Sequence, residues 1–279
     1  MARFVYFGFD IFAPCLERLL NDGHELVHLY SFFTDNKHDF NQRVINLAVA
    51  RDVPVSFHKP KAQELQTLYG QGCSDFISAG YAYKIPPLPK DAFGINIHPT
   101  LLPLGRGKFP LPHVLLNHPE AGGVSVHKLA PEFDTGDILL QKAIEVQKED
   151  DLETLSAKVV RDAPDLISEV MRNKEHYVSN ARPQNEKEVS LWQFPSNEMR
   201  TIDWASPVSE INRIGRAFSR AGWIAPIQGI DYWVYQYKAW PENHGFTPGD
   251  VVSILDREIA VAAQDGFVCL KEFEAKQDS

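Results

Sequence analysis

The sequence is poor in cysteine and has no long apolar run, and both features exclude classes of protein. Three cysteines occur in 279 residues, at Cys15, Cys73 and Cys269. Their odd number and wide spacing argue against a disulfide framework or a zinc site, so we expect reduced thiols and no bound metal. No stretch approaches the roughly 20 apolar residues that are needed to cross a bilayer. We therefore expect a cytoplasmic protein that does not enter a membrane.

Cationic side chains are also scarce. Lys and Arg number 28 against 37 Asp and Glu, which gives a formal charge of −9 and a pI near 5.6. A large nucleic-acid surface needs clustered Lys and Arg, so this balance disfavours a nucleic-acid partner. It does not exclude a local basic pocket for a phosphorylated small molecule.

What the sequence does contain is a regular alternation of short apolar runs and amphipathic segments. Strands are predicted at 3–9, 25–32, 53–57, 75–80 and 93–98, and helices at 12–21, 41–51 and 61–70. Such an alternation predicts an α/β fold with a Rossmann-like, mostly parallel sheet and helices on both faces.

Beyond Pro99 the pattern changes. A helix is predicted at 112–118, strands at 123–129 and 138–146, and a long amphipathic helix at 151–173. Residues 176–198 are polar with little periodicity, which indicates a linker. A helix capped by Ser206 follows, and then short apolar runs between Gly, Pro and Asp turns, which are typical of a small OB-like β domain. The predicted boundaries are 1–175 for the larger domain, 176–198 for the linker and 199–279 for the C-terminal domain.

Two polar side chains stand out at the end of the strand at 93–98. Asn96 and His98 are two residues apart, so both project from the same face of the strand. Open α/β sheets bind ligands at the carboxyl edge of their strands, where these side chains fall. The Pro- and Gly-rich loop that follows is of the kind that builds a pocket.

A carboxylate lies in the Gly-containing turn between the next two strands, at Asp134. An amide can donate a hydrogen bond to a developing oxyanion, and an imidazole can carry a proton near neutral pH. A carboxylate can raise the pKa of the imidazolium and orient it, or hold a water that relays the proton of the amine. Asn96, His98 and Asp134 are therefore the groups required for acyl transfer to an amine, in which the amine itself is the nucleophile. Each motif alone is commonly structural, and only their order and spacing together indicate this chemistry.

The stretch GINIHPTLLPLGRGKFPLPHVLL…GGVSVHKLAPEFDTGDILLQ resembles the signature of the formyltransferase family that uses N10-formyltetrahydrofolate. That family includes formyltransferases acting on methionyl-tRNA, glycinamide ribonucleotide and amino sugars linked to nucleotides. The resemblance covers residues 3–175 and continues more weakly into RTIDWASPVSEINRIGRAF. It implies that Asn96, His98 and Asp134 match the catalytic trio of the family, with N10-formyltetrahydrofolate as co-substrate.

The resemblance also implies where the donor binds. The backbone near Tyr83 and Ile85, and around Leu129 and Pro131, would hydrogen-bond the pterin ring. The family usually has an aromatic residue before its Arg-Gly pair, but this chain has Gly105 there, and we expect Phe109 to fill the missing volume.

The acceptor amine is less well specified. A basic insertion that reaches into tRNA normally follows the second strand of methionyl-tRNA formyltransferase, whereas SFFTDNKHDFNQRV is short and nearly balanced in charge. The leading hypothesis is a nucleotide-linked amino sugar, with Arg106 and Lys108 as contacts for its phosphates and Asp10 at the edge of the acceptor pocket.

Other readings stay open from the sequence alone. A hydroxylated ornithine of a siderophore pathway is a rival acceptor, and methionyl-tRNA and water, in a formyl-folate hydrolase, are further ones. A non-catalytic nucleotide-binding module is disfavoured because no G-x-G-x-x-G or P-loop lysine follows the first strand. The sequence also leaves open whether the chain forms a homo-oligomer.

Overall fold

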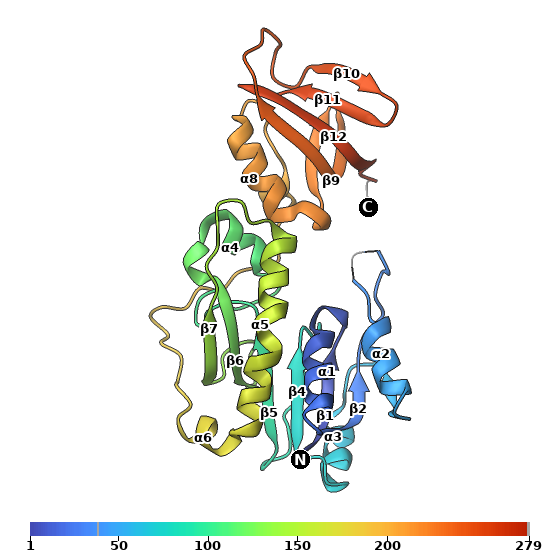
Figure 1. The fold of residues 1–279 in the computed structure, drawn as a ribbon, viewed down its shortest axis with the longest axis vertical. Helices are drawn as coiled ribbons and strands as arrows, with labels where there is room; N and C mark the ends of the chain where they lie inside the picture. The colour runs from blue at the N-terminus through green and yellow to red at the C-terminus, as the bar shows by residue number, and fades with distance from the viewer. Residues whose placement is uncertain (38, 278–279) are drawn as a thin grey trace. The chain divides into compact units, whose positions relative to one another are not determined.

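The computed structural model describes residues 1–37 and 39–277, which fold as two compact units (Figure 1). The N-terminal unit comprises residues 1–108, 121–145 and 157–192, and the C-terminal unit comprises 109–120, 146–156 and 193–279. Segments 109–120 and 146–156 thus group with the C-terminal unit although they precede residue 175.

The N-terminal unit is built on a seven-stranded sheet. In spatial order its strands are β3 (Val55–Ser56), β2 (Glu25–Tyr30), β1 (Arg3–Gly8), β4 (Asp75–Ala79), β5 (Phe93–His98), β6 (Gly123–Lys128) and β7 (Ile138–Ala143). The first five run parallel, and β6 and β7 add in antiparallel fashion. The mostly parallel Rossmann-like sheet that the sequence predicts is therefore confirmed.

Helices cover both faces of this sheet. They are α1 (Ala13–Asn21), which follows the short 3-10 turn η1 (Asp10–Phe12), α2 (Gln42–Val49), α3 (Ala62–Gly70), α5 (Leu152–Arg172) and α6 (Lys174–Ser179). Tyr6 of β1 faces the α1 side, since its hydroxyl donates to the Phe12 carbonyl at 2.9 Å. Its neighbours Val5 and Phe7 point the other way and pack with Leu65 of α3. Successive residues of the strand thus serve opposite faces.

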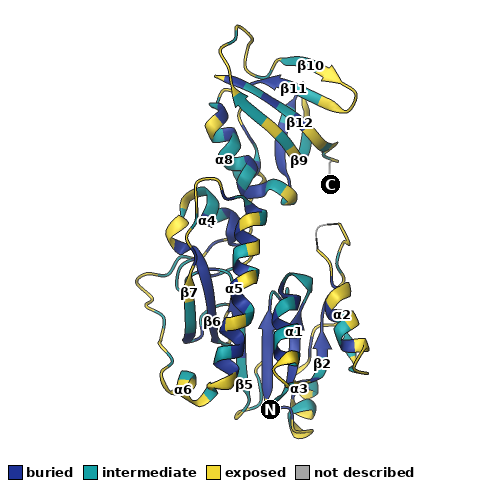
Figure 2. Cartoon of the chain, viewed as in Figure 1, coloured by how far each residue is buried: buried dark blue, intermediate teal, exposed yellow. Residues whose placement is uncertain are grey.

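Burial follows the same logic. Strand β4 is buried along its whole length, and β1 is buried from its second residue onward (Figure 2). A strand that is covered on both faces has no solvated side, which is why the apolar residues of these strands show no regular alternation and the polar Asp75 and Ser78 of β4 are buried as well.

The C-terminal unit combines short helices with a five-stranded antiparallel sheet. Its helices are α4 (Leu111–Asn117), η2 (Pro119–Ala121), α7 (Asn197–Arg200), α8 (Val208–Phe218) and η3 (Ser219–Ala221). Its strands, in spatial order, are β10 (Val251–Leu255), β11 (Glu258–Ala262), β12 (Gly266–Ala275), β9 (Ile230–Pro241) and β8 (Trp223–Ile227). The β-rich C-terminal domain is thereby confirmed.

The predicted cap of α8 is wrong. The helix begins at Val208 with Pro207 as its N-cap, and no side chain of the cap residue accepts a hydrogen bond. The Val208 N–H instead donates to Asp265 Oδ1 at 2.7 Å. A distant carboxylate therefore supplies the acceptor that the sequence assigned to Ser206, which no local pattern could reveal.

Membrane insertion of a helix finds no support in the described part of the chain. None of its helices combines the length and the apolarity that a bilayer span requires.

Candidate active site

The end of β5 places two polar side chains beside a third on β6. Strand β5 pairs with β6 in antiparallel register, so that Asn96 lies opposite His127 and His98 opposite Ser125. Directly opposed residues of an antiparallel pair project from the same face. Asn96, His98 and His127 thus gather at the carboxyl edge of the parallel strands, as predicted for the first two.

Asp134 reaches this group from the turn between β6 and β7. Its backbone is in the left-handed region at φ 59°. One carboxylate oxygen, Oδ2, accepts from the Gly107 N–H at 3.0 Å. The other, Oδ1, lies 3.4 Å from His98 Nδ1 and 3.4 Å from Asn96 Nδ2. The structure therefore brings the three residues singled out by the sequence together around one oxygen atom.

His127 is a fourth member of this group that the sequence reading missed. Its Nε2 lies 3.1 Å from Asn96 Nδ2 and 3.6 Å from Asp134 Oδ1, and the residue is 1% exposed. The signal was present in the alternation of GVSVHK, where a histidine interrupts a buried strand, but its partner became clear only with the strand register.

Backbone carbonyls fix the tautomers of both imidazoles. His98 Nε2 lies 2.8 Å from the Gly105 carbonyl, and His127 Nδ1 lies 2.9 Å from the Lys128 carbonyl. A carbonyl only accepts, so each of these nitrogens carries a hydrogen. The remaining nitrogens, His98 Nδ1 and His127 Nε2, both face Asp134 Oδ1 and are the ones available to take up a proton.

Burial and neighbouring charge act in opposite directions on the two central groups. His98 is 4% exposed, and burial lowers its pKa below the ordinary value, although the Asp134 carboxylate opposes this. Burial raises the pKa of Asp134, but the His98 and His127 imidazoles and the Gly107 N–H outweigh it and hold that pKa well below its usual range. Near neutral pH the site therefore holds an ionised carboxylate next to a neutral imidazole.

Arg106 and Lys108, the predicted phosphate contacts, differ in their surroundings. The Arg106 side chain is buried, donating from Nε to Gln184 Oε1 at 3.0 Å and pairing with Glu186 at 2.8 Å. Lys108 is exposed. A phosphate would have to compete with Glu186 for Arg106, whereas Lys108 reaches solvent directly.

Gly105 has an aromatic neighbour, but not the expected one. A Cβ atom at Gly105 would clash with the ring of Trp192, which lies 2.5 Å from that position. Phe109 instead stacks on Phe194 with ring centroids 5.6 Å apart. The expectation that Phe109 fills this volume is wrong, because a residue more than 80 positions away supplies the ring.

Asp10 has a structural partner in the N-terminal unit. Its carboxylate accepts from the Arg43 and Val44 N–H groups at 3.0 and 2.9 Å, in the first turn of α2. It thus satisfies two N–H groups that a helix start leaves unpaired. Its place at an acceptor pocket stays a prediction.

The segments predicted to hold a pterin ring lie next to one another. Side chains of Leu88 and Leu129 both come within 3.1 Å or less of where a Cβ of Gly94 would stand. Tyr83 and Ile85 pack at the border of the neighbouring apolar cluster. Pro131 is exposed. The donor-binding roles of Tyr83, Ile85, Leu129 and Pro131 stay predictions.

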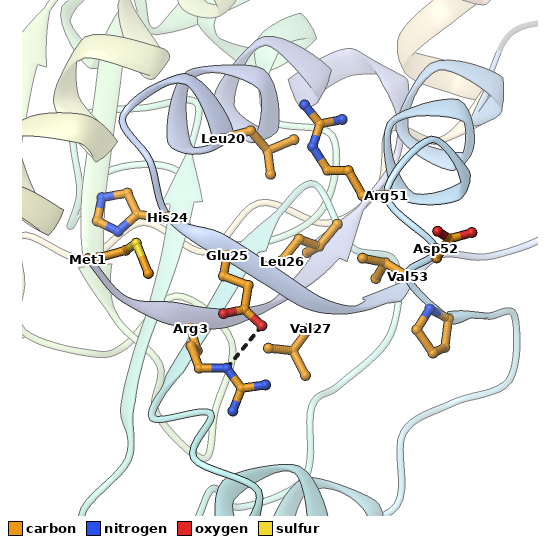
Figure 3. Close-up of a pocket in the computed structure, with 11 residues that line it drawn as sticks. Met1, Arg3, Leu20, His24, Glu25, Leu26, Val27, Arg51, Asp52 and Val53 are labelled. Carbon is orange, nitrogen blue, oxygen red and sulfur yellow. Dashed lines mark hydrogen bonds and ion pairs between the residues drawn. The ribbon is translucent and has the colours of Figure 1, made fainter.

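The N-terminal unit also has a shallow hollow of about 520 Å³, far from this chemistry (Figure 3). Arg3 and Glu25 form an ion pair in it, with 3.1 Å between Nε and Oε1. These residues begin β1 and β2, so the hollow lies at the amino edge of the sheet. Ligands of parallel sheets bind at the opposite edge, where Asn96 and His98 lie.

Two protein-family models match the chain. The model described as formyl transferase matches residues 33–171, and the model described as formyl transferase, C-terminal domain, matches residues 196–278. The first match lies within residues 1–175, and the second begins at residue 196, three residues before the predicted start of the C-terminal domain.

Individual proteins agree with these models. A methionyl-tRNA formyltransferase of Streptococcus sanguinis is 25% identical over 283 residues, which cover 97% of this chain and 90% of that protein. The structure of HypX from Aquifex aeolicus with tetrahydrofolic acid superposes with a TM-score of 0.75 at 18% identity, covering 99% of this chain. This chain spans 44% of the length of that protein.

A protein solved with a sugar nucleotide has the same fold over its full length. An N-formyltransferase of Helicobacter canadensis, solved with folinic acid and dTDP-3-aminofucose, superposes with a TM-score of 0.65 at 16% identity. The match covers 98% of this chain and all of that one. With both family models in their expected order and the polar cluster at the sheet edge, the chain belongs to the formyl transferase family and is a transferase enzyme.

Proposed function

We propose that this enzyme transfers the formyl group of N10-formyltetrahydrofolate to the amine of a small acceptor, with a nucleotide-linked amino sugar as the leading candidate. The observation that carries the chemistry is the convergence of Asn96 Nδ2 and His98 Nδ1 on one oxygen of Asp134. Formyl transfer needs an oxyanion donor, a base and a carboxylate within one small volume, and these three groups provide them.

The reaction uses these groups in turn. The acceptor amine attacks the formyl carbon, a C–N bond forms and the carbonyl oxygen becomes an oxyanion. Asn96 Nδ2 donates a hydrogen bond to that oxygen, replacing one that it gives to His127 or Asp134 in the free enzyme. His98 Nδ1 takes the proton from the attacking nitrogen, and the ionised Asp134 stabilises the imidazolium. The intermediate then expels the folate nitrogen, which receives the proton.

The lowered pKa of His98 suits this role. A neutral imidazole is the form that accepts a proton, and burial keeps His98 neutral at physiological pH. The Asp134 carboxylate stabilises the charged His98 imidazolium that forms when the amine releases its proton. Burial also restricts water, which would otherwise hydrolyse the donor.

Two features support the proposed donor site at Tyr83, Ile85 and Leu129. Among the described residues, Tyr83 and Ile85 form no backbone hydrogen bond, so their N–H and C=O groups stay available. Apolar side chains of Leu88 and Leu129 lie nearby at Gly94. Apolar walls with a few free backbone groups are the usual lining of a small-molecule site.

Charge favours a small acceptor over tRNA. Residues 193–279 contain twelve Asp and Glu against eight Lys and Arg, and the whole chain carries −9. A tRNA acceptor would require several phosphate contacts, each of which needs a cation. A sugar nucleotide carries two phosphates, for which the exposed Lys108 and, after release from Glu186, Arg106 suffice.

An acceptor panel tests the proposal. Purified enzyme and N10-formyltetrahydrofolate are incubated with dTDP-3-aminofucose, a hydroxylated ornithine, methionyl-tRNA or no amine, and release of tetrahydrofolate is followed by absorbance. We expect rapid release with the sugar nucleotide, and release that is slower by about 100-fold or more with Asn96→Ala. Fast release without any amine would assign a hydrolase, and release only with one of the other amines would replace the proposed acceptor.

Lys108→Gln sharpens the same assay. Loss of the charge should raise the KM for the sugar nucleotide roughly tenfold and leave kcat within about twofold, because the contact exists in both ground and transition states. Lys90→Gln, at another exposed lysine of the N-terminal unit, is the matched control. An unchanged KM in Lys108→Gln would remove this residue from the acceptor site.

A further inference from the structure

The segment at residues 184–192 runs alongside the loop at residues 105–107, and it provides none of the proposed reacting groups. Arg106 forms two backbone hydrogen bonds with it: its N–H donates to the Ser190 carbonyl at 3.0 Å, and its carbonyl accepts from the Trp192 N–H at 2.8 Å. The Ser190 hydroxyl also accepts from the Gly105 N–H at 2.7 Å. The segment thus fixes the backbone on either side of the Gly105–Arg106 bond.

Within this segment one side chain bridges two loops. Gln184 Nε2 donates to the carbonyls of Asp134 and Gly136, at 2.7 and 2.8 Å. Its Oε1 accepts from Arg106 Nε at 3.0 Å. The nitrogen and the oxygen of the Gln184 amide are therefore both hydrogen-bonded. The nitrogen binds the turn that carries Asp134, and the oxygen binds the loop that carries Arg106.

The two loops held by this bridge contribute differently to the contact between His98 and Asp134. Gly105, next to Arg106, supplies the carbonyl that fixes the His98 tautomer, and Gly107, on its other side, donates to Asp134 Oδ2. The other loop carries Asp134 itself, in a left-handed conformation that is unfavourable for a residue with a side chain. The Gln184 bridge, which we call the brace, connects these loops and thereby bears on the separation between the His98 imidazole and the Asp134 carboxylate.

We propose that Gln184 is a positioning residue, whose amide ties the Arg106 loop to the Asp134 turn and thereby holds the Asp134 carboxylate against His98. Gln184 touches neither of the two reacting side chains. The expected effect of Gln184 on kcat rests on the proposed function. Its effect on the position of the Asp134 carboxylate does not. Only an amide fits, since the brace needs one acceptor for Arg106 and two N–H donors for the carbonyls.

Glu186 completes the brace from the solvent side. It pairs with the far end of the Arg106 guanidinium while being 73% exposed itself. An exposed ion pair contributes little. Glu186→Gln should therefore have a much smaller effect than any change at Gln184.

Two variants separate the roles of the amide groups. Gln184→Ala removes all three hydrogen bonds, and Gln184→Glu keeps size and the acceptor for Arg106 but loses both donors. Each should lower kcat at least tenfold with KM for the donor within about twofold, because a misplaced group acts on the chemical step. The same changes at Gln264, which is exposed in the C-terminal unit, are the controls and should leave kcat unchanged.

A second readout does not depend on turnover. Nuclear magnetic resonance of the histidine ring, assigned with His98→Asn, follows the titration of His98 in the ligand-free enzyme. The titratable groups that face His98 are Asp134 and His127. Withdrawal of the carboxylate in Gln184→Ala should shift the titration of His98 to lower pH, since an adjacent negative charge raises the pKa of an imidazole.

The outcomes distinguish the two proposals. If the parent enzyme is active, the proposed role of Gln184 requires both the fall in kcat and the shift in the His98 titration. The absence of either result would overturn that role. If no amine is formylated by the parent enzyme, the proposed function fails while the titration alone decides the brace. Thermal unfolding of Gln184→Ala at neutral pH confirms that the variant is folded during both measurements.

Discussion

The N-terminal unit contains the largely buried Asp134 side chain and the C-terminal unit the buried Arg200 side chain, and the surroundings of these two charges differ. In the N-terminal unit, polar groups surround the Asp134 carboxylate: the Gly107 N–H and the imidazoles of His98 and His127. In the C-terminal unit, the Arg200 guanidinium lies over aromatic rings, with its carbon 4.9 Å from the ring centre of Phe218.

Among the described residues, Arg200 has no acid–base partner. Trp233 and Phe194 complete the set of rings, at 5.6 and 5.7 Å. One guanidinium nitrogen donates to the Pro195 carbonyl, and Nε has no hydrogen-bond partner among the described residues. A buried charge thus indicates catalysis only where groups that exchange protons converge on it, whereas a cation against rings contributes to packing.

The largest expected effect breaks the polar cluster. Asp134→Asn keeps the size of the side chain but removes the charge that stabilises the His98 imidazolium. We expect kcat to fall about 1,000-fold, within the range for loss of acid–base function. Asp91→Asn, an exposed aspartate of the same unit, is the control for steady-state kinetics. A fall of less than about tenfold would mean that the carboxylate is structural.

Asn96→Ala should have the next largest effect. The loss of one oxyanion donor costs about 100-fold or more in kcat in other acyl-transfer sites. KM for the donor should change little, because the hydrogen bond forms with the charged oxygen of the intermediate. The control is Asn46→Ala on the exposed face of α2. Equal losses in kcat and in affinity would instead place Asn96 in ground-state binding.

The pH dependence of kcat tests which form of His98 reacts. Because burial lowers its pKa below 6.5, the neutral imidazole persists to lower pH than in a free histidine. If this form is the base, kcat is constant near neutral pH and falls about tenfold per pH unit once the pH drops below that lowered pKa. Rate measurements between pH 5 and 8 decide this. A rate that rises on acidification would assign the protonated form instead.

His127→Gln should be milder. The glutamine retains a polar side chain near Asn96 but removes an imidazole from Asp134 Oδ1. Since His127 acts on the neighbours of the reacting atoms, we expect kcat to fall about fivefold. Single-turnover rates measure this without interference from product release. A fall in kcat as large as that expected for Asp134→Asn would show that His127 is as important for the reaction as Asn96, His98 and Asp134.

The smallest effect is expected at Arg200. Arg200→Met replaces a desolvated cation with an apolar side chain of similar length, which is often neutral or stabilising. We expect kcat within about twofold and a free energy of unfolding within about 1 kcal/mol of the parent protein. Urea unfolding with kinetics on the same samples measures both. A large loss of activity would contradict the distinction drawn between the two buried charges.

The sequence predicted the sheet well because its signals are local. The strand at 93–98 was found with its observed bounds, and the two-residue period correctly placed Asn96 and His98 on one face. These inferences need only the chirality and periodicity of the backbone.

The residues that escaped prediction depend on contacts between distant segments. His127 became part of the site through the antiparallel register of β5 and β6, which periodicity does not specify. Gln184 and Trp192 lie in a stretch that reads as a linker, since a segment that binds through its backbone and single side chains needs no repeating pattern. Asp265 at the start of α8 is a third case.

The turn that carries Asp134 also limits how this enzyme can be altered. At Gly136 the carbonyl of Lys128 occupies the space of any Cβ, and two residues earlier the chain already adopts a left-handed conformation. A mutant library that randomises this turn would consist largely of misfolded clones. Engineering of new substrate ranges is better directed at solvent-facing positions such as Lys108, whose side chain is exposed.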